Sequence, residues 1–441
     1  MQFKREIYQE LKAWKTKPTR KPLLLMGARQ IGKTTVLKSF GAGEYESCLY
    51  LNLEKQTEVH GFFAKDKSPG PILNNLSLIH GRTIVPNKTL VILDEIQECR
   101  DALIALKYFN EEMPDLHIVG AGSLLGLSLG NTRSFPVGKV EILDMYPLTF
   151  SEYLFVANKK EYKAFHHFLD SIDQIPDAFF SPLHKSFKEY LLFGGMPEVA
   201  SHFLEHRNIL AAQDIQDQIL RAYELDFVKH ADRTNATKIQ HIWNSLPSQL
   251  AKENKKFLYS VIRSGARARA YEEALQWLKD AGLIYKIPRV EKVGAPLKAY
   301  EDLSVFKLYL FETGMLMRMS ALDPRTYIDG DQFFTEFKGS VAENYVAQSL
   351  KKIYNRAPSY WTSQGKAEVD FLIEHFGSTI PVEVKSGSAT KAKSLAVYKQ
   401  KYNPKLRIRV SNLNLKKNDD LLNVPLFYAD YINSLVEKAI D

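Results

Sequence analysis

The chain has 441 residues, more than one hydrophobic core usually serves, so we expect several domains. Its hydrophobic residues (45%) and charged residues (25%) are typical of folded globular proteins and exclude a low-complexity or largely disordered chain. The formal net charge of +8 permits an anionic partner, and the two isolated cysteines, Cys48 and Cys99, indicate neither a disulfide framework nor a zinc site.

The sequence shows no sign of membrane insertion or secretion. No run of about eighteen apolar residues could span a bilayer, and the charged N-terminal segment lacks the apolar core of a signal peptide. We therefore expect a cytoplasmic protein with no membrane partner.

The first chemical motif lies in KPLLLMGARQIGKTTVLKSF, residues 21–40. This segment predicts a strand from Leu23 to Met26, a glycine turn, and a helix that begins near Lys33. It contains the phosphate-loop pattern G-x4-G-K-[ST], which ends at Lys33 and Thr34. In such a loop the backbone amides and the helix N-terminus attract phosphate, the lysine reaches the β and γ oxygens, and the threonine ligates magnesium.

A second apolar strand, TLVILDEIQ (89–97), ends in two acids. We expect Asp94 to hold Mg²⁺ and Glu95 to orient the attacking water. The alternative is that both acids cap the next helix. A third strand, LHIVGAGSLL (116–125), carries Ser123, whose hydroxyl either senses the γ-phosphate or caps a helix.

Strands that alternate with helices in this way predict an open, mostly parallel sheet with the function at the strand C-termini. The residues expected to contact the nucleotide are Gly27, Ala28, Arg29, Gln30, Ile31, Gly32, Lys33, Thr34, Thr35 and Ser123.

These segments, together with YLNLE (50–54) and VGKVEILDMYPLTFSEYL (137–154), resemble the AAA-type ATPase domain of bacterial and archaeal ATP-binding proteins that carry a DUF4143 domain. Further similarity in YLLFGGMPEV, NKKFLYSVI, KLYLFETGML and FKGSVAENYVAQSL extends the resemblance over nearly the whole chain. It implies a P-loop ATPase that uses ATP and Mg²⁺, with Lys33 and Glu95 as catalytic residues. Arg133 is the nearest candidate for an arginine finger, and assembly into a homo-oligomer is left open.

The middle of the chain predicts two further modules. Residues 150–235 have a helical pattern that breaks at FGGMP (193–197), which indicates a lid or insertion beside the nucleotide. Residues 241–290 then predict helix, turn, helix, helix and a hairpin that begins at Leu283, the order of a winged helix. Its arginines at 263, 267 and 269 would meet DNA phosphates, unless the module serves only for packing.

The C-terminal region predicts a second site. A helix at 339–350, strands at 359–363, 367–374 and 379–387, a helix at 391–402 and a strand at 405–411 follow the order of the PD-(D/E)xK restriction-endonuclease-like fold. In that fold Asp370 and Glu383 would ligate Mg²⁺, Lys385 would stabilise the nucleophile, and Glu343 would complete the site. The alternative is a simple ion pair between Glu383 and Lys385, which share one face of a strand.

A basic segment follows this second site. Between Lys385 and Lys417 the chain has no acidic residue, and its basic residues are 385, 391, 393, 399, 401, 405, 407, 409, 416 and 417. A helix and strand of this charge can hold a nucleic acid backbone without reading its sequence. A solvated basic face is the alternative.

We therefore expect an α/β protein in four parts. These are an AAA-type P-loop ATPase domain with a parallel sheet (1–150), a helical lid (151–235), a winged helix (236–300) and a DUF4143-type, restriction-endonuclease-like domain (301–441). The expected function is Mg²⁺-dependent ATP hydrolysis coupled to a DNA-binding C-terminal domain that also cuts DNA. The alternative is a nucleotide-dependent switch or scaffold whose C-terminal domain only binds nucleic acid or protein.

Overall fold

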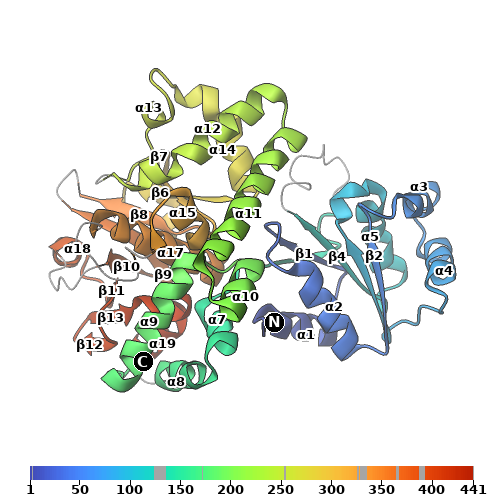
Figure 1. Cartoon of the computed structure of the whole chain (residues 1–441), viewed down its shortest axis with the longest axis horizontal. Coiled ribbons are helices and arrows are strands. Elements are labelled where there is room, and N and C mark those ends of the chain that lie inside the picture. The colour runs from blue at the N-terminus through green and yellow to red at the C-terminus, as the bar shows by residue number, and fades with distance from the viewer. Residues whose placement is uncertain are drawn as a thin grey trace. The chain divides into compact units, whose positions relative to one another are not determined.

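The structure, a computed structural model, describes residues 1, 3–123, 136–170, 172–252, 255–324, 327, 335–363, 367–386 and 393–440. Two of the residues discussed above, Arg133 and Lys391, lie outside this set. The chain divides into an N-terminal unit, Lys4–Pro147 with Asp280–Gly282, and a C-terminal unit, Met1–Phe3 with Leu148–Lys279 and Leu283–Asp441 (Figure 1). None of the described helices combines the length and apolar character needed to cross a membrane.

The N-terminal unit is built on a five-stranded sheet in which every described pair is parallel, in the order β2-β3-β4-β1-β5. The predicted open parallel sheet is thus confirmed. Its strands are β1 (Leu23–Gly27), β2 (Ser47–Asn52), β3 (Thr89–Asp94), β4 (His117–Ser123) and β5 (Glu141–Asp144). The connecting elements are α1 (Ile7–Thr16), α2 (Lys33–Glu44), η1 (Thr57–Val59), α3 (His60–Lys65), α4 (Pro69–His80), η2 (Ile96–Glu98) and α5 (Arg100–Glu112).

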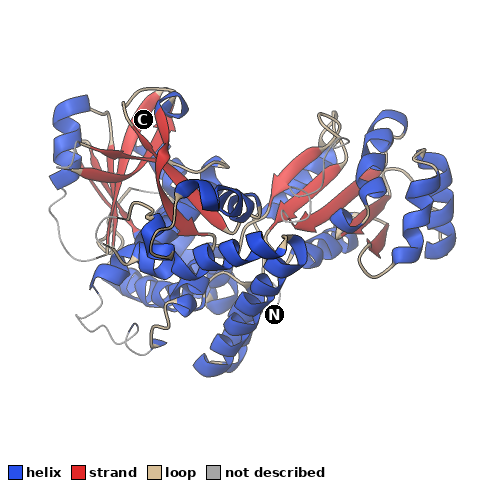
Figure 2. Cartoon of the chain, turned by 90° about the horizontal axis from the view of Figure 1, so that it is seen from above, coloured by secondary structure: helices blue, strands red, loops and turns tan. Residues whose placement is uncertain are grey.

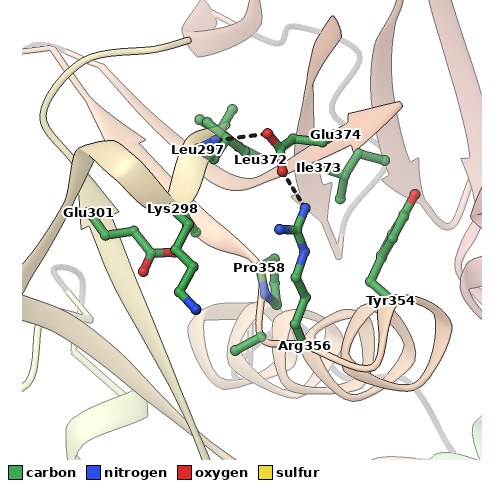
Figure 3. A pocket seen from close by; sticks show the side chains of 11 residues that line it. Leu297, Lys298, Glu301, Tyr354, Arg356, Pro358, Leu372, Ile373 and Glu374 are labelled. Atoms are coloured by element: carbon green, nitrogen blue, oxygen red, sulfur yellow. Dashed lines mark hydrogen bonds and ion pairs between the residues drawn. The ribbon is translucent and has the colours of Figure 1, made fainter. Parts of the chain in front are cut away.

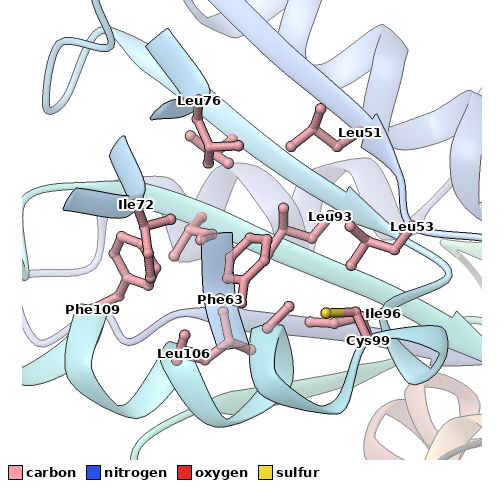
Figure 4. Packing of buried hydrophobic residues seen from close by; sticks show 14 of the residues in the cluster. Leu51, Leu53, Phe63, Ile72, Leu76, Leu93, Ile96, Cys99, Leu106 and Phe109 are labelled. Atoms are coloured by element: carbon pink, nitrogen blue, oxygen red, sulfur yellow. The ribbon is translucent and has the colours of Figure 1, made fainter. Parts of the chain in front are cut away.

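Successive strand residues face opposite sides of this sheet, so its buried strands are apolar throughout. One face, which includes Met26, Leu51 and Leu93, packs against α3, α4 and α5 in a single buried cluster. Figure 4 shows Phe63 of α3 between Leu93 of the sheet and Leu106 of α5. The sheet is therefore held rigid beneath the loops that follow its strands.

The C-terminal unit begins with a run of helices, as the sequence predicts. These are α7 (Phe150–Ala157), α8 (Lys159–Leu169), α9 (Asp177–Phe193), α10 (Pro197–His206), α11 (Ile209–His230), α12 (Arg233–Leu250), α13 (Tyr259–Ile262) and α14 (Ala268–Asp280). Later helices are η3 (Leu297–Tyr300), α15 (Thr313–Met319), α17 (Thr335–Tyr354), α18 (Lys393–Tyr402), η5 (Leu426–Tyr431) and α19 (Ile432–Ile440). Figure 2 shows these helices gathered around the second sheet.

That second sheet has eight described strands in the order β12-β13-β11-β10-β9-β8-β6-β7. The strands are β6 (Ile284–Val290), β7 (Glu301–Leu310), β8 (Ser359–Thr362), β9 (Glu368–His375), β10 (Ser378–Lys385), β11 (Arg407–Ser411), β12 (Lys416–Asn418) and β13 (Leu421–Pro425). The predicted order of elements from α17 to β11 is confirmed. Its assignment to the restriction-endonuclease-like fold stays a prediction.

The predicted winged-helix segment also has its expected order, with α12, α13 and α14 followed by the β6–β7 hairpin. However, β6 also pairs in parallel with β8, so the hairpin extends the C-terminal sheet. The sequence could not show this, because the pairing joins segments about seventy residues apart. The predicted boundary at residue 300 falls within the hairpin, and the winged-helix assignment stays a prediction.

The break at FGGMP separates α9 from α10 and is fixed by a buried carboxylate. Glu312 is fully buried and accepts hydrogen bonds from the backbone N–H groups of Gly195 and Met315, both at 2.8 Å. Gly194 has φ of +80°, and a Cβ atom there would lie 2.4 Å from Glu312 Oε1. The absence of a side chain at Gly194 therefore permits the close approach of this loop to Glu312.

We expect Phe63→Ala to lower the free energy of unfolding by about 3–5 kcal/mol, because the ring is fully buried in the N-terminal cluster. Urea denaturation followed by circular dichroism measures this decrease. Phe376→Ala is the matched control, since its ring is 93% exposed, and it should cost less than about 0.5 kcal/mol. Equal decreases in the two variants would contradict the assignment of the core.

Candidate functional site

The phosphate loop lies between the end of β1 at Gly27 and the start of α2 at Lys33. Within it Ala28 and Ile31 are buried, whereas Gln30 is exposed and has φ of +61°. A Cβ atom on Gly27 would lie 2.4 Å from the carbonyl oxygen of Met145, so only glycine lets the loop pass this backbone. The loop amides thus stay together at the N-terminus of α2, the arrangement that binds phosphate.

Lys33 is buried within this loop, with 8% of its surface exposed. Its ammonium donates hydrogen bonds to the carbonyl oxygens of Gly27 (3.0 Å) and Ala28 (2.7 Å). Burial lowers the pKa of Lys33 to about 8, although the charges of Glu95 and Asp94 act against that shift. A phosphate anion would therefore be a stronger partner for this ammonium than the neutral carbonyls.

The Asp94 side chain, at the end of β3, is linked to the phosphate loop by a hydrogen bond from Thr34. The Thr34 hydroxyl donates to Asp94 Oδ2 at 2.7 Å, and the Tyr50 hydroxyl donates to the same oxygen at 2.8 Å. Hydroxyl and carboxylate oxygens are the hard ligands that Mg²⁺ prefers, so Thr34 and Asp94 fit the predicted magnesium site. Tyr50 lies in YLNLE and holds the carboxylate in place, a role that the sequence analysis did not assign.

Glu95, the predicted catalytic acid, has φ of +52°, a backbone conformation that is uncommon outside glycine. Its Oε2 accepts a hydrogen bond of 2.6 Å from the side-chain amide of Gln97. Strained backbone of this kind concentrates at functional sites. The geometry therefore favours a functional role for Glu95 over the alternative of a simple helix cap.

Ser123 ends β4, and the parallel register places it opposite Gly27 of β1. Its hydroxyl is buried, with 2% of the residue exposed, and has no hydrogen-bond partner within the part of the chain that the structure describes. Buried hydroxyls normally have a partner. Contact with a phosphate oxygen would supply one.

Arg5 is a further contact of the phosphate loop that the sequence analysis missed. Its guanidinium donates to the carbonyl oxygens of Ile31 (2.8 Å) and Tyr146 (2.7 Å). These bonds tie the loop to the segment that follows β5. No local signal marks Arg5, because a basic residue before an amphipathic helix is common.

A second group of charged side chains lies in the C-terminal unit. Asp370 on β9 accepts a 2.8 Å hydrogen bond from the backbone N–H of Val384 on β10, between Glu383 and Lys385. Lys385 Nζ lies 2.8 Å from Glu383 Oε1, and Glu383 Oε2 accepts a hydrogen bond from the N–H of Leu395 at 3.3 Å. The structure thus brings the three predicted residues together and contains the ion pair that was the alternative.

Two lysines that the sequence analysis missed complete this group. Lys307 on β7 is fully buried, forms an ion pair with Glu368, and lies 3.9 Å from Asp370 Oδ1. Lys255 forms an ion pair with Glu343. We use the name ionic cluster for Lys255, Lys307, Glu343, Glu368, Asp370, Glu383 and Lys385.

A usable signal for Lys307 is its position in the apolar stretch VFKLYLF (305–311), since a lysine inside a buried strand requires a partner. Burial opposes its charged form, yet the nearby carboxylates, Glu343 first among them, raise the pKa of Lys307 above the ordinary lysine value. Burial and the charge of Glu343 also raise the pKa of Asp370, against the effect of Lys307.

Each predicted magnesium ligand of the ionic cluster lies beside a lysine in the structure. Glu343 and Glu383 are each paired with a lysine, and Asp370 faces Lys307, so every ligand carboxylate already has a cation beside it. Among the described residues, no three His, Cys, Asp or Glu side chains form a group that could hold a metal ion.

The basic segment after Lys385 is less available to an anion than its sequence suggests. Lys399 and Arg407 both pair with Asp420, at 2.9 and 2.7 Å, and Arg409 is buried against Asn423. The lysines at 393, 401, 405 and 416 are exposed, as are the arginines at 263, 267 and 269 of the predicted winged helix.

A separate cavity of about 160 Å³ opens beside η3 and β9. Figure 3 shows Arg356 reaching Glu374 across it, and the N–H of Leu297 donates to the same carboxylate at 2.8 Å. None of the predicted site residues lines this cavity.

The parallel sheet, the phosphate loop after β1 and the acids after β3 together define a P-loop ATPase site. The family described as AAA domain matches residues 19–154, so the N-terminal unit is an AAA-type ATPase domain, as predicted. DUF4143, a domain of unknown function, matches residues 338–427, as also predicted. Another domain of unknown function, DUF8612, matches residues 184–326 and crosses the predicted boundaries at 235 and 300.

Several solved structures are similar to the chain. The Walker-type ATPase of Pyrococcus abyssi has 15% identity and a TM-score of 0.44, over 72% of this chain and 96% of that chain. The RuvB Holliday junction branch migration motor of Thermotoga maritima has 17% identity and a TM-score of 0.30, over 65% and 90%. Drosophila ORC bound to DNA has 13% identity and a TM-score of 0.27, over 68% and 90%. No curated protein matches the chain.

We expect Arg5→Gln to raise the KM for ATP about tenfold or more, because it removes the charged group whose hydrogen bonds position the phosphate loop. A hydrogen bond from a charged group contributes about 1.5–3 kcal/mol. Steady-state kinetics should show kcat less affected than KM, and Arg5→Lys should restore part of the effect. Lys12→Gln, on the exposed side of α1, is the control. Unchanged KM in Arg5→Gln would show that the loop does not depend on this brace.

Proposed function

We propose that the N-terminal unit hydrolyses ATP with Mg²⁺. The observation that carries the proposal is the arrangement of Lys33, Thr34 and Asp94, a buried ammonium in the phosphate loop beside two hydrogen-bonded oxygen ligands. Mg²⁺ held by Thr34 and Asp94 would neutralise charge on the phosphates. Glu95, oriented by Gln97, positions the attacking water.

The remaining nucleotide contacts belong to the loop and to β4. Residues 27–35 surround the phosphates with backbone amides, and Lys33 exchanges its carbonyl partners for β and γ oxygens. Ser123 donates its buried hydroxyl to the γ-phosphate, which gives this hydroxyl the partner it otherwise lacks among the described residues.

We further propose that ATP binding and hydrolysis control a C-terminal unit that binds DNA without sequence preference, in the cytoplasm. The support is the set of exposed lysines at 393, 401, 405 and 416 and the exposed arginines of the α13–α14 region. Such side chains contact phosphates, which are the same at every base pair.

Cutting of DNA is the second candidate. It is favoured by the approach of Asp370 to the β10 backbone between Glu383 and Lys385. In this hypothesis Asp370, Glu383 and Glu343 ligate the metal ion and Lys385 lies beside the nucleophile. The lysine partners of those carboxylates count against it, and magnesium-dependent nicking of DNA by the purified protein separates the two candidates.

We expect Lys33→Ala to abolish ATP hydrolysis, because the loop then lacks the ammonium that contacts the β and γ phosphates. Glu95→Gln should bind ATP with near-normal affinity and release no phosphate. Phosphate-release and nucleotide-binding assays measure these effects, and Lys65→Ala, an exposed lysine of the same unit, is the control. Hydrolysis at the wild-type rate by Lys33→Ala would refute the assignment of the site.

We expect replacement of Lys393, Lys401, Lys405 and Lys416 by glutamine to weaken DNA binding. The slope of log affinity against log salt should fall by about 0.9 for each DNA phosphate that the variant no longer neutralises. Fluorescence anisotropy with a labelled duplex over a salt series measures this slope.

The matched control for that experiment removes the same amount of charge from the N-terminal unit, with glutamine at the exposed lysines 55, 65, 88 and 107. Identical affinity and slope in the C-terminal variant and the wild type would remove the basic segment from the proposal.

A further inference from the structure

Lys307 occupies a position where a charged side chain requires a specific partner. It lies inside β7, and none of its side-chain surface is exposed. Its ammonium reaches Glu368 and Asp370, which are two residues apart on β9 and therefore share a face of the strand. Because a buried ammonium is unfavourable unless it is paired, these two carboxylates account for the presence of Lys307.

Lys255 pairs with the carboxylate of Glu343 on α17, as Lys307 does with the carboxylates on β9. The side chains of Lys255 and Glu343 form an ion pair with 12% and 10% of their surfaces exposed. The second oxygen of Glu343 accepts a hydrogen bond of 2.9 Å from the hydroxyl of Tyr309. Tyr309 is two residues after Lys307 on β7, so the same face of this strand contacts both the Glu343 carboxylate and the carboxylates on β9.

The charges of the ionic cluster are nearly balanced. Four carboxylates face three ammonium groups, which leaves a net charge of −1. A divalent cation would change this sum to +1 and would lie close to lysines that repel it. Lys255 and Lys307 come from segments outside the strands that carry Asp370 and Glu383, so the motif formed by those strands does not reveal them.

We propose that the ammonium groups of Lys255 and Lys307 take the place of a divalent ion in the ionic cluster. They permanently supply the positive charge that a bound divalent ion would otherwise bring to its carboxylates. The cluster then has no divalent cation site in the wild-type protein. The C-terminal unit consequently contacts its nucleic acid without cutting it. The ion-binding part of this inference does not rest on the proposed ATPase or DNA-binding functions.

The test is a titration of the full chain with Mn²⁺, in which electron paramagnetic resonance measures the bound and free ion. The parent protein carries Asp94→Asn and is free of nucleotide, so that the magnesium site beside the phosphate loop does not contribute. We expect no saturable Mn²⁺ site that depends on Asp370 in this parent. Lys307→Met in the same background should acquire such a site through Glu368 and Asp370. It should bind Mn²⁺ at least tenfold more tightly than the parent protein does.

Lys298→Met, an exposed lysine of the same unit, is the matched control and should bind Mn²⁺ as the parent does. Where Lys307→Met does not fold, as judged by circular dichroism, Lys255→Met takes its place, because its side chain is not fully buried.

Two results would overturn the proposal. One is a parent protein that binds Mn²⁺, or nicks supercoiled DNA with it, in a manner abolished by Asp370→Asn. The other is a folded Lys307→Met or Lys255→Met variant that acquires no site, since the lysines would then not be what excludes the ion. Failure of the protein to bind DNA would contradict the proposed function and leave the Mn²⁺ result intact.

Discussion

The two sites of this protein both depend on one physical constraint, that a charge removed from water must be given partners by the fold. Lys33 and Lys307 are both buried lysines, with 8% and 0% of their surfaces exposed. Lys33 is held by two neutral carbonyl oxygens of its own loop. Lys307 is held by carboxylates. The difference in partners separates a site prepared for an anion from a site whose charges are already nearly balanced.

The pKa values of these two lysines shift in opposite directions because their partners differ. Burial dominates at Lys33 and lowers its pKa to about 8, because the carboxylates of Asp94 and Glu95 do not fully compensate. At Lys307 the surrounding carboxylates outweigh burial and raise the pKa. A phosphate that enters the loop completes the electrostatics around Lys33. A dication that enters the ionic cluster disturbs a balance that its lysines have established.

The place of the candidate N-terminal site could be predicted from the sequence because its residues lie in short segments at strand ends. In a parallel sheet the carboxyl ends of neighbouring strands lie at one edge, so motifs that end β1, β3 and β4 must meet there. Arg5 and Gln97 escaped notice because their roles depend on hydrogen bonds to single backbone or side-chain atoms. Such bonds leave no spacing pattern in one sequence.

The C-terminal unit was predicted less completely, for the opposite reason. The order of its helices and strands could be predicted, but Lys255, Lys307 and the β6–β8 pairing join segments far apart in the chain. The basic segment was overestimated because Asp420, just beyond its end, pairs with Lys399 and Arg407. Charge counted along the chain therefore exceeded the charge available at the surface.

The most direct test of the ATPase assignment is a crystal structure of the protein with a non-hydrolysable ATP analogue and Mg²⁺. Our account predicts that Lys33 Nζ leaves the carbonyls of Gly27 and Ala28 for phosphate oxygens. It also predicts a metal ion about 2.1 Å from Thr34 Oγ1, on the side of Asp94. A nucleotide bound elsewhere, or a bound nucleotide with Lys33 still on its carbonyl partners, would contradict the account.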